Sequence, residues 1–129
     1  MTDSSAIAGA LDRLENLQSA LAAISSRTDE RRRFDLIDHR RKLAEQMIEM
    51  GRVADSFFAR LDRPALLQVY RDKFSRMRSA AAMHQASWPA VRLNEADDEY
   101  QRSVSAVREA NRDFVDWLRA TIASVLSGM

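Results

Sequence analysis

The sequence predicts an all-α fold, an up-down-up-down four-helix bundle with two long and two shorter helices. Apolar residues recur at alternating spacings of three and four along four separate stretches, as in amphipathic helices that pack on one another. Only three glycines and two prolines occur among 129 residues, so long helices with short connections are favoured. Short connections make successive helices antiparallel neighbours. A single domain is expected over 1–129, with helices at about 6–26, 29–61, 64–86 and 94–126.

The first two helices follow from long apolar seams. The first should end at the serine pair that begins with Ser25, whose hydroxyl competes for backbone hydrogen bonds. Thr28 or Asp29 can cap the second helix. Only Arg40 interrupts the seam of the second helix, and Gly51 inside it indicates a close helix crossing or a slight bend. Further apolar side chains widen that seam, namely Ile37, Ala44, Ile48 and Phe58.

The third helix is bounded by the two prolines. Pro64 suits the first turn of a helix. Pro89 disfavours the helical conformation at the residue before it, so the helix should end there. Residues 88–93 are expected to form an extended strap that brings its apolar side chains near Phe34 and Leu36.

The fourth helix is expected to begin after Asn94, a good N-cap. Carboxylates crowd its first turn, where they stabilise the positive end of the helix dipole. These acidic residues are Glu95, Asp97, Asp98 and Glu99. Asn111 lies among apolar seam positions of this helix. It is either buried, where it would fix the helix register, or at a partly hydrated edge.

Helix lengths predict an exposed apolar patch at one end of the bundle. At about 1.5 Å per residue, the second and fourth helices span about 50 Å and the others roughly 30 to 35 Å. The first helix should therefore stop short of the end where the second helix turns. The expected partner-binding residues there are Phe57, Phe58, Leu61, Leu66, Val125 and Leu126. Such patches usually mark interfaces, unless the N-terminal residues or a helix tilt cover them.

A basic run at 27–42 includes Arg31, Arg32 and Arg33, which oppose the dipole of the second helix. The acidic start of the fourth helix lies at the same end of the predicted bundle and would form salt bridges with them. The alternative is that these three arginines bind an anion such as a nucleic-acid backbone. The run has no glycine-rich phosphate loop and no interleaved aromatic residues. We expect the salt bridges, and no nucleic-acid partner.

The two histidines, His39 and His84, are candidate phosphoacceptors, because histidine phosphotransfer domains are four-helix bundles of this size. Those domains normally have an exposed histidine in a pattern close to HxxKG. The residues that follow here are Arg-Arg-Lys-Leu and Gln-Ala-Ser-Trp, which match poorly. The other interpretation is a surface His39 and a packed or helix-terminal His84.

Catalytic and metal-binding motifs are absent from the sequence. It contains no HExxH, GxGxxG or serine-elbow pattern. A metal site in a bundle needs Glu-x-x-His motifs, but Leu36 and Ala81 lie three residues before the histidines. The lack of cysteine excludes thiolate chemistry. We therefore expect no enzyme activity, no metal and no cofactor.

Composition favours a cytoplasmic protein. The net charge of +1 gives no general attraction to nucleic acid or acidic membranes. A chain without cysteine is compatible with a reducing compartment. The N-terminal residues show no basic and apolar pattern of a secretory signal, and no apolar run approaches the 18 residues or so of a membrane span.

The stretch from Leu11 to Met47 resembles flagellar and type III export chaperones of the FlgN and FliT kind. A leucine-seamed helix ends in a polar break, and a second helix then carries Phe-Asp-Leu-Ile-Asp-His-Arg-Arg-Lys-Leu-Ala-Glu-Gln-Met, residues 34–47. The resemblance implies a bacterial cytoplasmic protein that holds the amphipathic helix of an export substrate in an apolar groove.

Together these observations predict a non-enzymatic helical interaction protein, chaperone-like or regulatory. It would bind a partner helix, or a second copy of itself as a homo-oligomer, through the apolar bundle end. The alternative is a histidine phosphotransfer module.

Overall fold

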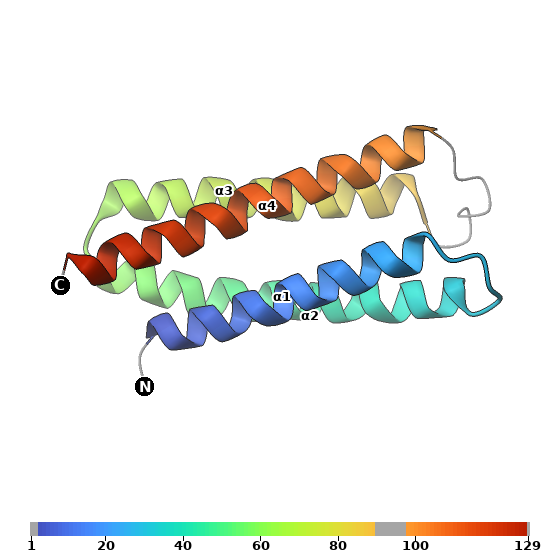
Figure 1. The fold of residues 1–129 in the computed structure, drawn as a ribbon. Coiled ribbons are helices and arrows are strands. Elements are labelled where there is room, and N and C mark those ends of the chain that lie inside the picture. The colour runs from blue at the N-terminus through green and yellow to red at the C-terminus, as the bar shows by residue number, and fades with distance from the viewer. Residues whose placement is uncertain (1–2, 90–97, 129) are drawn as a thin grey trace.

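The structure, a computed structural model, describes residues 3–89 and 98–128. These residues form four helices, and short connections at 26–31 and 61–63 join the first helix to the second and the second to the third (Figure 1). The helices are α1 (Asp3–Ser25), α2 (Arg32–Arg60), α3 (Pro64–Ser87) and α4 (Asp98–Ser127). The all-α four-helix bundle is confirmed, with two longer helices of 29 and 30 residues and two shorter ones of 23 and 24. The expected start of the fourth helix at 94–97 lies outside the described residues.

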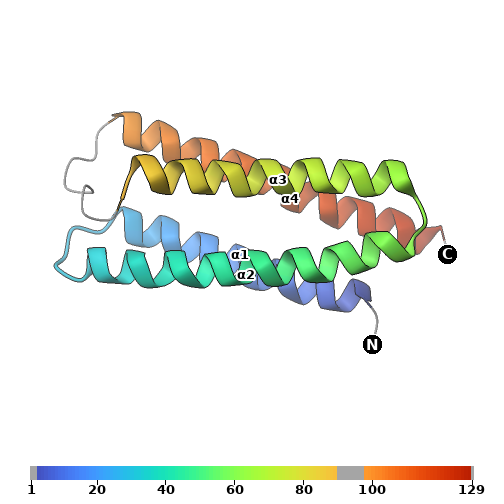
Figure 2. The ribbon, with the colours of Figure 1, turned by 180° about the vertical axis from the view of Figure 1, so that it is seen from behind.

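The bundle consists of two helical hairpins. α1 packs along α2, and α3 packs along α4. α2 and α3 join the hairpins, whereas α1 and α4 make the sparsest contact of the four neighbouring pairs. Figure 1 shows α1 and α4 at the front of the molecule, and Figure 2 shows α2 and α3 from behind. The molecule therefore has one tightly closed edge within each hairpin and two looser faces between the hairpins.

The main core fills the centre and one end of the bundle. Side chains from all four helices are fully buried in it, including Leu14, Met50, Tyr70, Met77, Phe114 and Leu118. Gly51 makes room for the Phe74 ring of α3 on the surface of α2, because a Cβ at this position would lie 3.0 Å from that ring. The sequence left open a close helix crossing or a slight bend at Gly51, and the contact found there is with the Phe74 side chain.

A second, smaller core lies at the opposite end and contains Ile24, Leu36, Trp88 and Tyr100. The Trp88 and Tyr100 rings pack edge to face at 5.3 Å. The predicted packing of Trp88 near Leu36 is confirmed, whereas Phe34 is 64% exposed and lies outside this core. The other strap residues expected to pack here, 90–93, lie outside the described residues.

The α1–α2 connection is organised by Asp29. Its carboxylate accepts a hydrogen bond from the Arg31 backbone N–H at 2.9 Å and a bidentate pair from the Arg27 guanidinium at 2.7 Å. The Arg32 N–H donates to the Asp29 carbonyl, so a turn precedes the helix and α2 begins three residues later than predicted. The Arg27 ion pair holds the pKa of Asp29 at about 2.

The apolar end that was expected to be exposed is mostly buried. Phe57, Phe58 and Val125 are buried, and among the six predicted interface residues only Leu126 is exposed, at 49%. Leu61 and Leu66 are half-buried against the core. The expectation was wrong for two reasons. α1 begins at Asp3, earlier than predicted, and aromatic rings from α3 and α4 stack on Phe58 at 4.8 and 5.8 Å.

Candidate functional site

The basic run does not converge on one point. The Arg31 guanidinium lies 5.4 Å from the centre of the Phe34 ring, and Arg32 donates to the Ser25 carbonyl at 2.6 Å. Arg33 is exposed. Of the four acidic residues expected to pair with these arginines, Glu95 and Asp97 lie outside the described residues, and no ion pair joins the arginines to Asp98 or Glu99. Elsewhere in the run, Arg27 pairs with Asp29 and Asp35, and Arg41 and Lys42 both pair with Asp38.

The two histidines lie in different environments. His39 is half-buried on α2, and its Nδ1 lies 3.0 Å from the Asp35 carbonyl oxygen. A hydrogen bond to that carbonyl leaves Nε2 as the acceptor nitrogen. His84 is half-buried at the end of α3, with Nδ1 2.6 Å from the Ser103 hydroxyl and its ring packed against Tyr100. The prediction of a surface His39 holds only in part.

An apolar groove of about 570 Å³ lies between α2 and α3, on the face seen in Figure 2. Its floor is formed by Leu43, Met47, Gly51, Phe74 and Ala81, and small residues at Ala44 and Ala82 widen its mouth. Ile48 lies on its rim and is 75% exposed. This is the most exposed large apolar side chain among those of the described residues. The groove therefore presents both a cavity and an apolar side chain to solvent.

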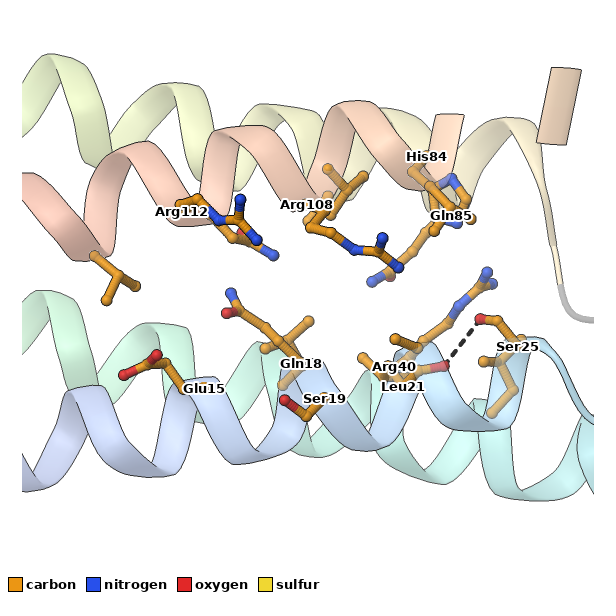
Figure 3. Close-up of a pocket in the computed structure, with 18 of the residues that line it drawn as sticks. Glu15, Gln18, Ser19, Leu21, Ser25, Arg40, His84, Gln85, Arg108 and Arg112 are labelled. Atoms are coloured by element: carbon orange, nitrogen blue, oxygen red, sulfur yellow. Dashed lines mark hydrogen bonds between the residues drawn. The ribbon is translucent and has the colours of Figure 1, made fainter. Parts of the chain in front are cut away.

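A polar cleft of about 390 Å³ lies on the opposite face, between α1 and α4 (Figure 3). It forms because the facing seams carry small or polar residues where a closed bundle would have leucines. On α1 this seam reads Glu15, Gln18, Ala22 and Ser25. On α4 it reads Val104, Arg108, Asn111 and Val115. These positions repeat at spacings of three and four, so each set lines one side of its helix.

Three arginines point into this cleft. Figure 3 shows Arg108 and Arg112 extending from α4 and Arg40 extending from α2 into the space between the hairpins. Arg40 donates to the Trp88 carbonyl at 2.9 Å. Within the described ranges, none of the three forms an ion pair with a carboxylate. Burial lowers the pKa of the half-buried Arg40, and burial beside Arg40 lowers the pKa of His84 below 6.5.

One polar atom on each of two amide side chains in the cleft is buried and has no hydrogen-bond partner among the described residues. Asn111 is 8% exposed, and its Oδ1 has no hydrogen-bond donor among the described residues. The Nε2 of Gln18, which faces the cleft from α1, likewise has no acceptor there. Buried polar groups almost always have partners, so each orphan group calls for a solvent molecule or a ligand. Of the two open sequence interpretations of Asn111, the structure shows the buried one.

An ion pair closes one end of the cleft. Arg119 on α4 pairs with Asp12, at 3.1 Å, and with Glu15 on α1. This contact bridges the two neighbouring helices that otherwise make the sparsest contact with each other. Glu15 is therefore engaged, which leaves Asp116 as the other carboxylate that lines the cleft in the described part of the chain.

Three features of this site were missed by sequence reasoning. The seam analysis assigned Ile48 to the broad core face of the second helix, and it did not single out Gln18 or Arg108. One signal was available, since Arg108 and Asn111 lie three residues apart on the same seam as Val104. Two adjacent polar positions in one seam indicate a hydrated or ligand-lined stretch.

The described residues contain neither a cluster of metal-ligating side chains nor a helix that could span a membrane. No group of three or more histidine, aspartate or glutamate side chains among them is arranged to hold a metal ion. No helix in that part of the chain combines the length and the apolar character needed to cross a membrane. The chain matches no protein-family model, no curated protein and no solved structure.

Proposed function

We propose that this protein is a non-enzymatic helical interaction protein of the cytoplasm that docks an amphipathic helix onto the groove between α2 and α3. The observation that carries the proposal is Ile48, which is 75% exposed on the rim of an apolar groove. Removing such a side chain and its groove from water is favourable by roughly 25 cal/mol per Å² of apolar area. The groove, rather than the buried bundle end, is the surface available for this purpose.

The shape of the groove suits a helix. Glycine and alanine at Ala44, Gly51 and Ala82 let a second backbone approach closely, and the Phe74 ring and Met47 supply an apolar floor. Grooves of this kind take helices whose apolar residues recur at spacings of three and four. Methionine side chains adapt to the shape of the incoming residues.

The proposed occupant is α2 of a second copy, because α2 is self-complementary about Ile48. Arg41 and Asp55 lie seven residues before and after Ile48, on the same side of the helix. An antiparallel pair of α2 helices related by a two-fold axis at Ile48 would place each Arg41 opposite the other copy's Asp55. Both residues are exposed. Such an isologous contact closes as a dimer.

The test is the oligomeric state of the full chain, measured by sedimentation equilibrium over a range of concentrations. Ile48→Glu should weaken dimerisation at least about tenfold, a loss of about 1.4 kcal/mol, because it buries a charge in the apolar contact. The matched control is Met83→Glu, since Met83 is 70% exposed on α3 but does not line the groove. Equal weakening by both variants, or a chain that stays monomeric near millimolar concentration, would refute the proposal.

A charge swap tests the antiparallel geometry. Arg41→Asp and Asp55→Arg should each weaken the dimer, and the double variant should restore it, because both cross-copy pairs are re-formed. If the double variant is weaker than either single variant, the pairing about Ile48 is wrong. The resemblance to export chaperones suggests a competing occupant, the helix of an export substrate. A peptide of that kind would then dissociate the dimer by taking the same groove.

Histidine phosphotransfer is the second candidate, and the geometry of His39 favours it. The carbonyl of Asp35 holds Nδ1 and leaves Nε2 as the nucleophile, on a helix surface of a four-helix bundle. Incubation with phosphoramidate should then give acid-labile phosphate on the wild-type chain and on His84→Gln, but not on His39→Gln. Absence of labelling on all three chains would end this candidate.

A further inference from the structure

The cleft between α1 and α4 has a polar interior that the protein itself leaves incomplete. Asn111 is more than nine-tenths buried, lines the cleft and has an unpartnered Oδ1, which can only accept a hydrogen bond. Gln18, across the cleft on α1, has an unpartnered Nε2, which can only donate. A molecule that satisfies both must present a hydrogen-bond donor and an acceptor. A hydroxyl group does both.

The charge of the cleft is uneven along its length. Arg40 and Arg108 lie toward the end formed by the last turns of α1 and α3, together with His84 and Gln85 (Figure 3). At the other end, Asp116 lies eight positions after Arg108, or about 12 Å at 1.5 Å per residue, with Arg112 between them. Glu15 on α1 lies toward the same end as Asp116 (Figure 3). Arg40 is half-buried and Arg108 is exposed, and neither has a carboxylate partner among the described residues. Such guanidinium groups favour an anion, and carboxylate matches their planar, two-pronged geometry.

The remaining wall of the cleft is apolar. Leu21, Leu43, Val104 and Val107 line it beside the arginines. A free phosphate ion has no apolar surface, so it would leave this apolar wall in contact with water. An organic acid with a hydrocarbon body would bury the same wall, and a volume of about 390 Å³ is within the ordinary range for a small-molecule site.

We propose that the cleft between α1 and α4 binds a small amphiphilic hydroxycarboxylate. Arg108 and Arg40 take the carboxylate, Asn111 and Gln18 take the hydroxyl, and Leu21, Val104 and Val107 cover the hydrocarbon. Arg40 already uses one N–H on the Trp88 carbonyl and keeps others for the ligand. The cleft opens on the face opposite the α2–α3 groove, and although Leu43, Ala81 and Gln85 line both, the residues proposed to bind the ligand do not line the groove, so the proposal does not rest on the helix docking.

The probe for this site is 3-hydroxydecanoate, titrated below its micelle concentration into the full chain and followed by calorimetry and NMR. Decanoate tests the contribution of the hydroxyl, 3-hydroxydecanamide tests the charge, and inorganic phosphate tests for simple anion attraction. We expect one saturable site for the hydroxy acid, weaker binding of decanoate and of the amide, and no measurable binding of phosphate. Shifted NMR resonances should come from residues of the cleft.

Two variants connect the binding to the cleft. Arg108→Gln should weaken 3-hydroxydecanoate binding at least about tenfold, because a hydrogen bond to a charged group contributes that much or more. Arg102→Gln on the same helix is the matched control, since Arg102 is exposed and does not line the cleft, and it should leave binding unchanged. Asn111→Leu should remove the preference for the hydroxy acid over decanoate.

The outcomes that would overturn the proposal are distinct. If the hydroxy acid does not bind, water alone occupies the cleft and forms the hydrogen bonds with Asn111 and Gln18. Binding that Arg108→Gln and Arg102→Gln weaken equally, or phosphate binding as strong as that of the hydroxy acid, shows nonspecific anion attraction. Circular dichroism of each variant establishes that it is folded, and neither arginine is buried, so both chains should retain the native helix content.

Discussion

Replacement of Asn111 by leucine should make the protein more stable. Asn111 is buried in the α4 seam between Arg108 and Val115, yet its Oδ1 has no donor among the described residues. In the folded chain this oxygen is buried away from bulk water, which hydrates it in the unfolded chain. Leucine removes the orphan acceptor and continues the apolar seam of α4. A natural residue that lowers stability at such a position points to a role other than packing.

The expected gain can be estimated from two contributions. An unsatisfied buried polar group costs about 1–3 kcal/mol. Burying a leucine side chain contributes a further 1.5–3 kcal/mol or so, but only part of this is realised because the cleft next to Asn111 stays open. Removing the orphan oxygen should contribute about 1 kcal/mol, and the partly buried leucine up to about 1 kcal/mol more, so we expect a net gain of about 1–2 kcal/mol in the free energy of unfolding. At about 2.1 cal/mol/K of unfolding entropy per residue, a 129-residue chain gains about 4 °C in Tm per kcal/mol.

Urea unfolding followed by far-UV circular dichroism measures this difference directly. Asn111→Leu should raise the urea midpoint with an unchanged m value, since the surface exposed on unfolding hardly changes. The matched control is Asn16→Leu, the same substitution at an exposed position of α1, which should shift stability by less than about 0.5 kcal/mol. If Asn111→Leu lowers the free energy of unfolding by 1 kcal/mol or so, the amide has an internal partner and the argument from its orphan oxygen is wrong.

Three further predictions follow from the packing and the charges. Gly51→Ala should lower the free energy of unfolding by about 1 kcal/mol despite the better helix propensity of alanine. The added Cβ would meet the Phe74 ring, which packs between two other aromatic rings. In denaturation experiments, Phe74→Leu should remove this penalty. Arg119→Met should lower the free energy of unfolding by less than about 1 kcal/mol, because the Arg119–Glu15 ion pair lies at the surface. A double-variant cycle with Glu15→Gln should show a coupling energy that decreases at high salt. A coupling energy that does not depend on salt would contradict a surface ion pair. Because the pKa of His84 is lowered in the folded chain, the unfolded chain binds the proton more readily, so stability should fall as pH drops below 6.5, and His84→Gln should flatten that part of a stability–pH curve.

The helices and their ends could be predicted from the sequence because local chemistry determines them. Pro64 begins α3 and Pro89 follows its end, as the restricted backbone of proline requires. The start of α2 is an exception: Asp29 was expected to cap this helix, but it lies in the turn before it, and the N-cap residue is Arg31, which makes no side-chain cap hydrogen bond. Gly51 marks the place where the Phe74 ring packs on α2, because a Cβ there would press on that ring. Each of these features depends on a few neighbouring residues or on one packed contact.

Exposure could not be predicted in the same way, because it depends on how the hairpins tilt and which rings they bring together. Helix lengths alone left Phe58 uncovered, but Tyr70 and Trp117, from the other hairpin, stack on it. Conversely, a three-four seam is broad enough to include Ile48 among the core residues of α2. It is the separation of α2 from α3 at that level which exposes it. The periodicity therefore identifies the apolar face of a helix, but it does not show which residues of that face are covered by neighbouring helices.

The cleft is a consequence of the residues that face each other across α1 and α4. A bundle selected only for stability would place large apolar side chains at Gln18, Arg108 and Asn111, and α1 and α4 would then pack as tightly as α1 and α2 do. Arginines without ion-pair partners in the described chain add electrostatic repulsion, and the buried amides add a desolvation cost. Both terms are reduced when an anion with a hydroxyl enters. The same residues that keep the two hairpins apart therefore form the proposed binding site. Apolar substitutions that close the cleft should raise the free energy of unfolding and abolish ligand binding.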